Sequence, residues 1–309
     1  MSRLAFVSHA DCGLHDTGWN HPEHVGRLRA VTRALRNDPE LFMRIEHVTP
    51  RHAVEAELAL AHDPAYIARV RDLSAAGGGK FDADTVTSEG SWAAATAGTG
   101  AVLDAIDMAI DGRSMRSFCA VRPPGHHALR ATGMGFCLFG NVAVGAHYAR
   151  ERHGLGRVLI VDWDVHHGNG TQALVEQAPD VRFVSMHQWP WYPGTGAEED
   201  RGPHGSVWNV PMAAALAPTR YAEALLRAVD AATRGWTPDL VLLSAGFDCL
   251  AGDPLGGFTL ELEHVDALTR ALVERADAWC GGRLVSALEG GYAPDKVGEA
   301  VLTHMRALE

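Results

Sequence analysis

Asp162, Asp164 and His166 are the residues whose types and spacing most directly suggest chemistry in this sequence. They stand at alternate positions at the end of an apolar run, residues 158–161. Because alternate residues of an extended chain share one face, the three side chains can converge on one point. Burying carboxylates is unfavourable unless they are paired or bind a cation. Oxygen and nitrogen donors of this kind suit a divalent ion such as Zn2+.

A catalytic zinc site needs three protein ligands and an open position for water. Asp253, in a Gly-Asp-Pro turn, is the best candidate for the third ligand. The alternative for Asp253 is a turn carboxylate that bonds to its own backbone. His126 and His127 follow Pro-Pro-Gly, and one of them can accept a proton from the attacking water while the other adjusts the charge. Alone, this pair would more often be two loop histidines without a role.

Two further residues are candidates to orient these imidazoles. A carboxylate such as Asp162 raises the basicity of an imidazole to which it is bonded, and the amide of Asn169 does so less. Asn169 lies between two glycines, so a simple turn role is the alternative. Tyr292 follows a predicted strand and two glycines, where its hydroxyl can donate to a developing oxyanion. The alternative for Tyr292 is an aromatic that packs beside a hinge.

Composition limits the class of protein. Lys and Arg number 27 against 38 Asp and Glu, which gives a formal net charge of -11. Such a chain has no general attraction for nucleic acid or for anionic membranes. The five cysteines are odd in number and widely spaced, which argues against a disulfide framework and favours a reducing compartment. No apolar stretch approaches the roughly 20 residues of a membrane span, so we expect a cytoplasmic protein.

Short apolar runs alternate with amphipathic segments, and this predicts an α/β fold. The apolar runs are continuous, as in a parallel sheet that is covered on both faces. Predicted strands cover residues 4–7, 118–121, 158–162, 182–186, 240–244 and 284–288. Predicted helices cover residues 24–36, 91–110, 142–152, 218–233, 260–279 and 294–307. With no repeat or low-complexity linker, we predict one three-layer domain over residues 1–309.

The candidate residues follow five of the predicted strands. They lie in the segments 122–127, 162–169, 185–187, 245–253 and 289–292. Ligands of open parallel sheets bind beyond the carboxyl ends of the strands. The pattern therefore favours an active site at that edge of the sheet.

In combination, these segments resemble the histone deacetylase family, which has an arginase-like fold. The matching blocks follow the family's order along nearly the whole chain: His21-Pro-Glu23, Arg122-Pro-Pro-Gly-His126-His127, Gly135-Phe136-Cys137, Asp162-Trp-Asp164-Val-His166-His167-Gly-Asn169, Tyr192-Pro-Gly, Gly252-Asp253-Pro254 and Glu289-Gly-Gly-Tyr292. The chain is similar in particular to class II enzymes and to bacterial histone deacetylase-like amidohydrolases. Asn169 is one reason, because class I enzymes usually carry Asp there.

The resemblance implies a catalytic role for each of these residues. Asp164, His166 and Asp253 would bind one Zn2+, although the same ligands can hold Fe2+. His127 would act as the general base and then as the acid for the leaving amine. His126 would contribute electrostatically, and Tyr292 would hold the oxyanion. The residues of the acyl-lysine channel would be Gly135, Phe136, Tyr192 and Leu255, and a structural K+ would be bound by Asp162, Asp164, His166, Ser185 and Met186.

Two positions bear on the substrate that the resemblance implies. Tyr292 is present where weakly active class IIa enzymes carry His, so we expect real deacetylase activity. Leu255 matches the leucine of lysine deacetylases, whereas the eukaryotic polyamine deacetylase has an acidic residue there. We therefore expect acyl-lysine in proteins or peptides, most often acetyl-lysine, and no nucleic-acid or membrane partner. Acetylpolyamines stay possible as substrates, because carboxylates at the rim of the site could pair with their ammonium groups. The candidate carboxylates are Glu23, Asp82, Asp84 and Glu89.

Two alternatives keep the fold but change the function. A catalytically silent binder of acyl-lysine would not need the intact histidines, the three candidate ligands and Tyr292. A binuclear manganese ureohydrolase would need more Asp ligands, for which only Asp248 is spare. The oligomeric state and the acyl-chain preference stay open.

Overall fold

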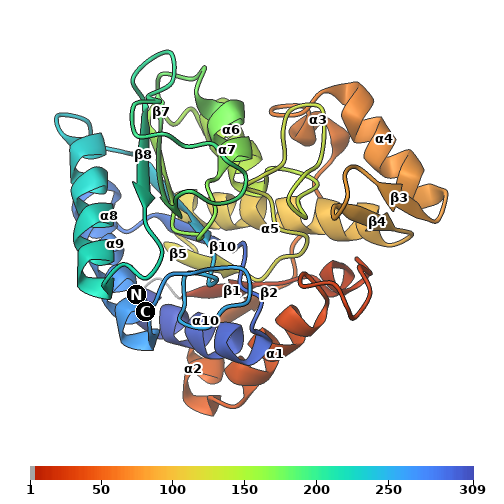
Figure 1. Cartoon of the computed structure of the whole chain (residues 1–309), viewed down its shortest axis with the longest axis horizontal. Helices are drawn as coiled ribbons and strands as arrows, with labels where there is room; N and C mark the ends of the chain where they lie inside the picture. The colour runs from red at the N-terminus through yellow and green to blue at the C-terminus, as the bar shows by residue number, and fades with distance from the viewer. Residues whose placement is uncertain (1–3) are drawn as a thin grey trace.

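The computed structural model describes residues 4–309 and has a parallel sheet at its centre. Within these residues, eight strands pair in the order β2-β1-β5-β10-β9-β6-β7-β8 (Figure 1). Every pairing in this sheet is parallel. The strands are β1 (Ala5–Val7), β2 (Glu46–Val48), β5 (Arg116–Cys119), β6 (Val158–Asp162), β7 (Val181–Gln188), β8 (Val207–Met212), β9 (Leu240–Ala245) and β10 (Leu284–Leu288). A separate antiparallel hairpin joins β3 (Gly78–Lys80) and β4 (Val86–Ser88).

Helices cover both faces of the sheet, which gives three layers (Figure 1). One apolar core lies against α1 (Gly26–Arg36), α2 (Pro39–Arg44), α8 (Pro218–Thr233), α9 (Leu262–Cys280) and α10 (Pro294–Leu308). The other lies against α3 (Glu55–Leu58), α4 (Pro64–Ala75), α5 (Ser91–Ile110), α6 (Asn141–His153) and α7 (Asn169–Val175). A short 3-10 helix, η1 (Ala10–Gly13), follows β1. The predicted α/β fold with a central, mostly parallel sheet is confirmed.

Strand β6 is covered on both faces, which explains the unbroken apolar run in its sequence. Leu159 and Val161 face one core, while Val158 and Ile160 face the other. Alternate side chains point to opposite faces of a strand, so both sets must be apolar when both faces are covered. The last residue, Asp162, is fully buried as well. The strand therefore ends in a buried carboxylate at the edge of the sheet.

The predicted elements agree with the structure where the apolar run is long. The helices α5 and α8 and the strands β6 and β10 have the predicted bounds. The strand predicted over residues 118–121 begins two residues earlier, and Val121 lies in the loop that follows. The short strands β2 and β8 were not predicted, nor were the hairpin and the helices α2, α3, α4 and α7. β2 has only three residues, none of them fully buried, and β8 contains Pro211, which is typical of an edge strand.

Helix α5 departs from the expectation that no segment is long and apolar enough for a membrane span. It has 20 residues, and an 18-residue window within it has a mean hydropathy of 1.2, which passes such a test by length and composition. Most of the helix is buried between the sheet and its neighbouring helices. Burial on nearly all sides gives a core helix the same apolar composition.

Candidate active site

The candidate residues meet because they follow neighbouring strands. β5, β10, β9, β6 and β7 are adjacent in the sheet, and their carboxyl ends lie at the same edge. The register places Asp162 of β6 level with Ser185 of β7 and with Ser244 of β9. Three loops therefore converge at this edge, as expected. The first carries the two adjacent histidines, the second carries the alternating Asp and His residues, and the third carries Tyr292.

Asp164, His166 and Asp248 form a compact group of possible metal ligands, called here the buried donor group. Their ligand atoms lie within 4.8 Å of one another. Oδ1 of Asp164 lies 3.0 Å from Nδ1 of His166, and Oδ2 of Asp248 lies 3.2 Å from the same nitrogen. Oδ2 of Asp248 is buried and accepts no hydrogen bond. A divalent cation nearby would compensate the charge on such an oxygen, so the surroundings of Asp164 and His166 fit a metal ion.

Asp253, predicted as the third ligand, lies beside the buried donor group and is not part of it. Its Oδ1 accepts a hydrogen bond from the backbone N–H of Leu255 (2.9 Å), and its Oδ2 accepts one from that of Tyr292 (2.6 Å). Burial raises the pKa of Asp253, and the negative charge of Asp164 acts in the same direction. Sequence reasoning treated Asp248 as a spare carboxylate, although it lies in the same loop after β9.

Backbone amides hold the carboxylate of Asp164 in place. Its Oδ1 accepts the N–H of His166 (2.9 Å), and its Oδ2 accepts the N–H of Gly290 (2.7 Å). A Cβ atom at position 290 would lie 2.1 Å from Oδ2 of Asp248 and 2.4 Å from Oδ2 of Asp164. Only glycine lets the backbone come close enough to donate this hydrogen bond.

Imidazoles balance part of the negative charge within the group. Burial alone would raise the pKa of Asp164, but nearby His126 and His166 lower it below the ordinary value. Burial would lower the pKa of His166, but Asp164 and Asp248 raise it to about 10. Burial and the charge of Asp164 raise the pKa of Asp248 to about 7. The site therefore concentrates negative charge that attracts a cation.

The two adjacent histidines have different partners and therefore different proton states. Nδ1 of His126 lies 3.0 Å from Oδ2 of Asp162. Burial by itself lowers the pKa of His126, but Asp164 and Asp162 raise it well above its usual range. Burial lowers the pKa of His127 well below its usual range, and His126 adds to this effect. His126 is thus the charged member of the pair and His127 the neutral one.

Asn169 fixes the tautomer of His127. Oδ1 of Asn169 lies 2.7 Å from Nδ1 of His127, while its amide nitrogen donates to the sulfur of Met134. An amide oxygen only accepts, so Nδ1 of His127 carries the proton. Nε2 is left with a lone pair, which is the state that a general base needs. The predicted interactions of Asp162 and Asn169 with the two imidazoles are both present.

Glu289 is a site residue to which sequence reasoning assigned no role. It is fully buried, and its Oε2 accepts the backbone N–H groups of Gly125 (2.7 Å) and His126 (3.1 Å). Its Oε1 accepts the hydroxyl of Ser244 (3.2 Å). Burial raises the pKa of Glu289 to about 7. Glu289 thereby fixes the loop that presents the two histidines, and only its position before Gly-Gly-Tyr signals this in the sequence.

Beneath the site lies a buried ion-pair network, and it corrects one expectation. Glu23, proposed as a rim carboxylate, is fully buried and paired with Arg27 (3.0 Å) and Arg122 (2.8 Å). Two guanidinium groups hold this carboxylate in the interior, so it cannot contact a substrate at the rim. Arg27 also donates to the backbone carbonyl of Gly291 (2.6 Å), and its guanidinium lies 5.2 Å from the centre of the Tyr292 ring. The network therefore supports the loop that carries Tyr292.

A cavity of about 220 Å3, the site cavity, opens above these groups. Its lining residues are Asp84, His127, Gly135, Phe136, His166, Trp191, Tyr192, Leu255 and Tyr292. All four residues predicted for the channel are among them. The ring centres of Phe136 and Tyr292 lie 5.7 Å apart, and those of His127 and Tyr192 lie 5.1 Å apart. A Cβ atom on Gly135 would lie 2.4 Å from the His127 ring, so glycine is needed there too.

The residues predicted to bind K+ also lie close together. Asp162 and Ser185 are level with each other on adjacent strands, and Met186 follows Ser185 in β7. The hydroxyl oxygen of Ser185 lies 3.1 Å from Nδ1 of His187. Oδ1 of Asp162 accepts the N–H of Asp164 (3.0 Å). Potassium itself stays a prediction.

Comparison with known proteins agrees with this geometry. A histone deacetylase-like amidohydrolase of Pseudomonas aeruginosa is 39% identical over 88% of this chain and 72% of its own length. The polyamine deacetylase HDAC10 of Homo sapiens is 35% identical over 98% of this chain, which spans 48% of that protein. An uncharacterised protein of Synechocystis sp. is 40% identical over 99% of both chains.

A solved structure supports the same assignment. The crystal structure of the HDA15 HD domain matches with a TM-score of 0.93 at 34% identity, and the match covers 99% of this chain and 88% of that chain. Residues 21–308 match the histone deacetylase domain family. The chain therefore belongs to the histone deacetylase family and is a hydrolase that acts on amides.

Proposed function

We propose that the protein is a zinc-dependent deacetylase that removes acetyl groups from the side-chain amine of lysine in proteins or peptides. The observation that carries this proposal is the site cavity, where His127, His166 and Tyr292 line one narrow space with apolar walls. A general base, a metal ligand and a hydroxyl donor thus face the same small volume. Amide hydrolysis at a metal centre uses these three kinds of group.

Asp164, His166 and Asp253 are the proposed zinc ligands, with Asp248 beside them. We keep Asp253 because the N–H of Tyr292 holds its carboxylate next to the buried donor group. When bound, zinc supplies Lewis-acid polarisation of the acyl carbonyl and activation of water.

The chain's own residues then move the proton and hold the developing charge. His127, with a bare Nε2, takes a proton from the attacking water and returns it to the leaving amine. His126, bonded to Asp162, provides positive charge beside the reaction. Burial raises the pKa of Tyr292 well above its ordinary value. Its hydroxyl therefore stays protonated and can donate to the oxyanion.

The channel residues favour a chain-like, uncharged substrate segment. Phe136, Tyr192 and Leu255 give the site cavity an apolar wall that suits the methylene stem of acyl-lysine. The carbonyl of Gly135 is the proposed acceptor for the substrate amide N–H. It already accepts the thiol of Cys137 (3.3 Å), and a carbonyl oxygen can accept two hydrogen bonds.

A second candidate is the deacetylation of acetylpolyamines by the same site. The observation in its favour is Asp84, an exposed carboxylate that lines the site cavity. Such a carboxylate can pair with a distal ammonium group of a polyamine. Leu255 is apolar at the position where the resemblance places an acidic residue in the polyamine enzyme, so we rank this function second.

A structural K+ near the zinc ligands is part of the proposal. The carboxylate of Asp162, the hydroxyl of Ser185 and backbone carbonyls near Asp164, His166 and Met186 are its proposed donors. Oxygen donors of this kind suit an alkali cation. The neighbouring positions of Asp162 and Ser185 on β6 and β7 support it.

The ligand set can be tested by metal content. Asp164→Ala should lower bound zinc by one equivalent per chain and abolish activity, because it removes the central ligand of the group. Asp253→Asn should also lose this equivalent, whereas the matched variant Asp248→Asn should keep it. Elemental analysis of dialysed protein measures both zinc and potassium. Loss of zinc in Asp248→Asn but not in Asp253→Asn would transfer the ligand role to Asp248.

Tyr292→Phe tests the oxyanion donor. Removing this hydroxyl should lower kcat by about 100- to 1,000-fold, because one donor to the developing charge is lost. Zinc content and circular dichroism should match those of the wild type. Steady-state kinetics on an acetyl-lysine peptide provide the measurement, and unchanged turnover would exclude the role.

Asn169 variants test the control of the His127 tautomer. Asn169→Ala removes the acceptor for Nδ1–H of His127 and should lower kcat by about 10- to 100-fold. Asn169→Asp keeps an oxygen acceptor at that position and should retain far more activity. The idea fails if the two variants are equally active under the same conditions.

Substrate panels separate the candidate functions. Acetyl-lysine peptides should give a higher kcat/KM than acetylputrescine or acetylspermidine. Asp84→Asn provides a matched control, since a polyamine enzyme should lose activity on polyamines much more than on peptides. A preference for the polyamines would reverse the ranking. Binding of acyl-lysine without turnover by zinc-loaded protein would instead indicate a silent binder.

A further inference from the structure

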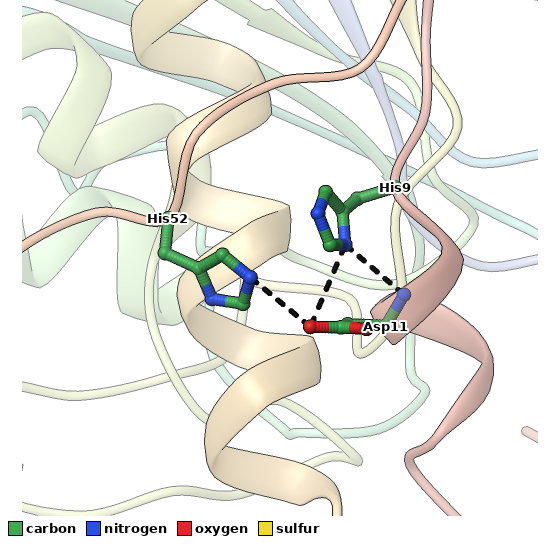
Figure 2. A group of neighbouring side chains, drawn as sticks. All are labelled: His9, Asp11 and His52. Atoms are coloured by element: carbon green, nitrogen blue, oxygen red, sulfur yellow. Dashed lines mark hydrogen bonds and ion pairs between the residues drawn. The ribbon is translucent and has the colours of Figure 1, made fainter.

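A second group of possible ligands lies outside the site cavity and comprises His9, Asp11 and His52 (Figure 2). His9 follows β1, Asp11 lies in η1, and His52 lies between β2 and α3. Their ligand atoms lie within 4.8 Å of one another. We propose that these three residues bind a divalent transition-metal ion, distinct from the ion of the proposed active site.

The distances fit the coordination of such an ion. Oδ2 of Asp11 lies 3.1 Å from Nε2 of His52 and 3.6 Å from Nδ1 of His9. A tetrahedral centre with bonds of about 2.0–2.2 Å separates its ligand atoms by about 3.3–3.6 Å. Figure 2 shows that both imidazole rings direct a nitrogen toward the same carboxylate oxygen. Little movement is therefore needed to place an ion among the three atoms.

The hydrogen bonds around His52 leave a lone pair on the nitrogen that faces Asp11. The hydroxyl of Thr96 donates to the carbonyl of Trp92 (2.8 Å) within α5, so its oxygen accepts from Nδ1–H of His52 (2.9 Å). Nε2 of a neutral His52 then has no proton and faces a carboxylate oxygen at 3.1 Å. Two acceptors at this distance repel each other unless a proton or a metal ion lies between them.

The hydrogen bond made by His9 identifies the nitrogen that would bind the ion. Its Nδ1 accepts the backbone N–H of Asp11 (3.1 Å), which occupies the single lone pair of this nitrogen, so the ion would replace that hydrogen bond. Two imidazole nitrogens and one carboxylate oxygen thus lie around one point. A ligand histidine commonly bonds through its other nitrogen to a fixed group, as His52 does to Thr96.

Exposure and charge at this group favour a metal ion from solution. The side chains of His9, Asp11 and His52 are 18%, 32% and 39% exposed, which leaves room for water as a further ligand. Two nitrogen donors and one oxygen donor suit Zn2+, Co2+ or Ni2+ rather than Ca2+ or Mg2+, which prefer oxygen. The adjacent Arg51 is paired with Glu57 (2.7 Å) and Asp104 (3.1 Å), so its positive charge is compensated.

Metal binding would connect two segments that are far apart in the sequence. It would link η1 to the segment between β2 and α3. The backbone carbonyls of Cys12 and His15, in and just after η1, accept hydrogen bonds from Arg122 at the start of the Pro-Pro-Gly-His-His loop. The ion would therefore stabilise the segments beside this loop in the folded chain. Because it binds the folded chain, it should also raise the melting temperature.

Metal stoichiometry tests the proposal directly. Wild-type protein is loaded with Zn2+, dialysed and measured by elemental analysis, and should hold two equivalents per chain. His52→Gln and Asp11→Asn should each hold one. Asp164→Ala should also hold one, and the double variant of Asp164→Ala with His52→Gln should hold none. His204→Gln, which removes an exposed histidine elsewhere, serves as the matched control and should hold two.

A milder variant tests the site without removing any of the three proposed ligands, so the result does not depend on a variant that could misfold. Thr96→Val keeps all three ligands and the shape of its side chain, but removes the acceptor for His52. It should weaken binding at this site by about 10- to 100-fold, as measured by Co2+ titration of Asp164→Ala protein with and without the change. The proposal is overturned if the wild type and His52→Gln bind equal amounts of zinc while circular dichroism shows both to be folded. Retention of one equivalent in His52→Gln but not in Asp164→Ala would support the active-site metal alone.

Discussion

The structure depends on holding several carboxylates together in a dry interior. Asp162, Asp164 and Asp248 are fully buried, and Asp253 is nearly so. Carboxylates at such short range repel one another, and the loss of water makes each charge less stable. Backbone amides, His126 and His166 compensate this repulsion in part. The remaining negative charge suits this edge of the sheet to the proposed cation, and the helices and strands around it fix the distances between the carboxylates.

Glycine makes this concentration of charge possible. At Gly290 the chain passes so close to Asp164 and Asp248 that a side chain would overlap with both. Gly135 passes equally close to His127. These two positions lie in different loops, yet each brings a backbone close to a residue of the proposed active site. These glycines are therefore part of the geometry of the proposed active site, and their substitution would displace the proposed ligands or the proposed base.

Local pattern was enough to predict the buried strand β6 and the closeness of Asp164 and His166, which follow it. The strand ends at Asp162, however, and Asp162 bonds to His126 and does not join the buried donor group. Contacts between distant segments carry no such signal. Three contacts depend on which segments the fold brings together. They are the approach of Asp248 to His166, the hydrogen bonds of Glu289 to the loop of the two histidines, and the pairing of Glu23 with Arg122. The group of His9, Asp11 and His52 depends on the pairing of β1 with β2, a strand too short to predict.

The small size of the site cavity has a consequence for substrate choice. About 220 Å3 is less than the roughly 300–1,000 Å3 that drug-sized ligands fill, so only the tip of a larger molecule can enter. For the proposed acyl-lysine substrate, the peptide that carries the lysine then remains outside. Trp191 and Tyr192 are 45% and 41% exposed at this opening. For such a substrate, these two exposed aromatic side chains would contact the residues on either side of the lysine, while the reaction inside the cavity would not depend on them.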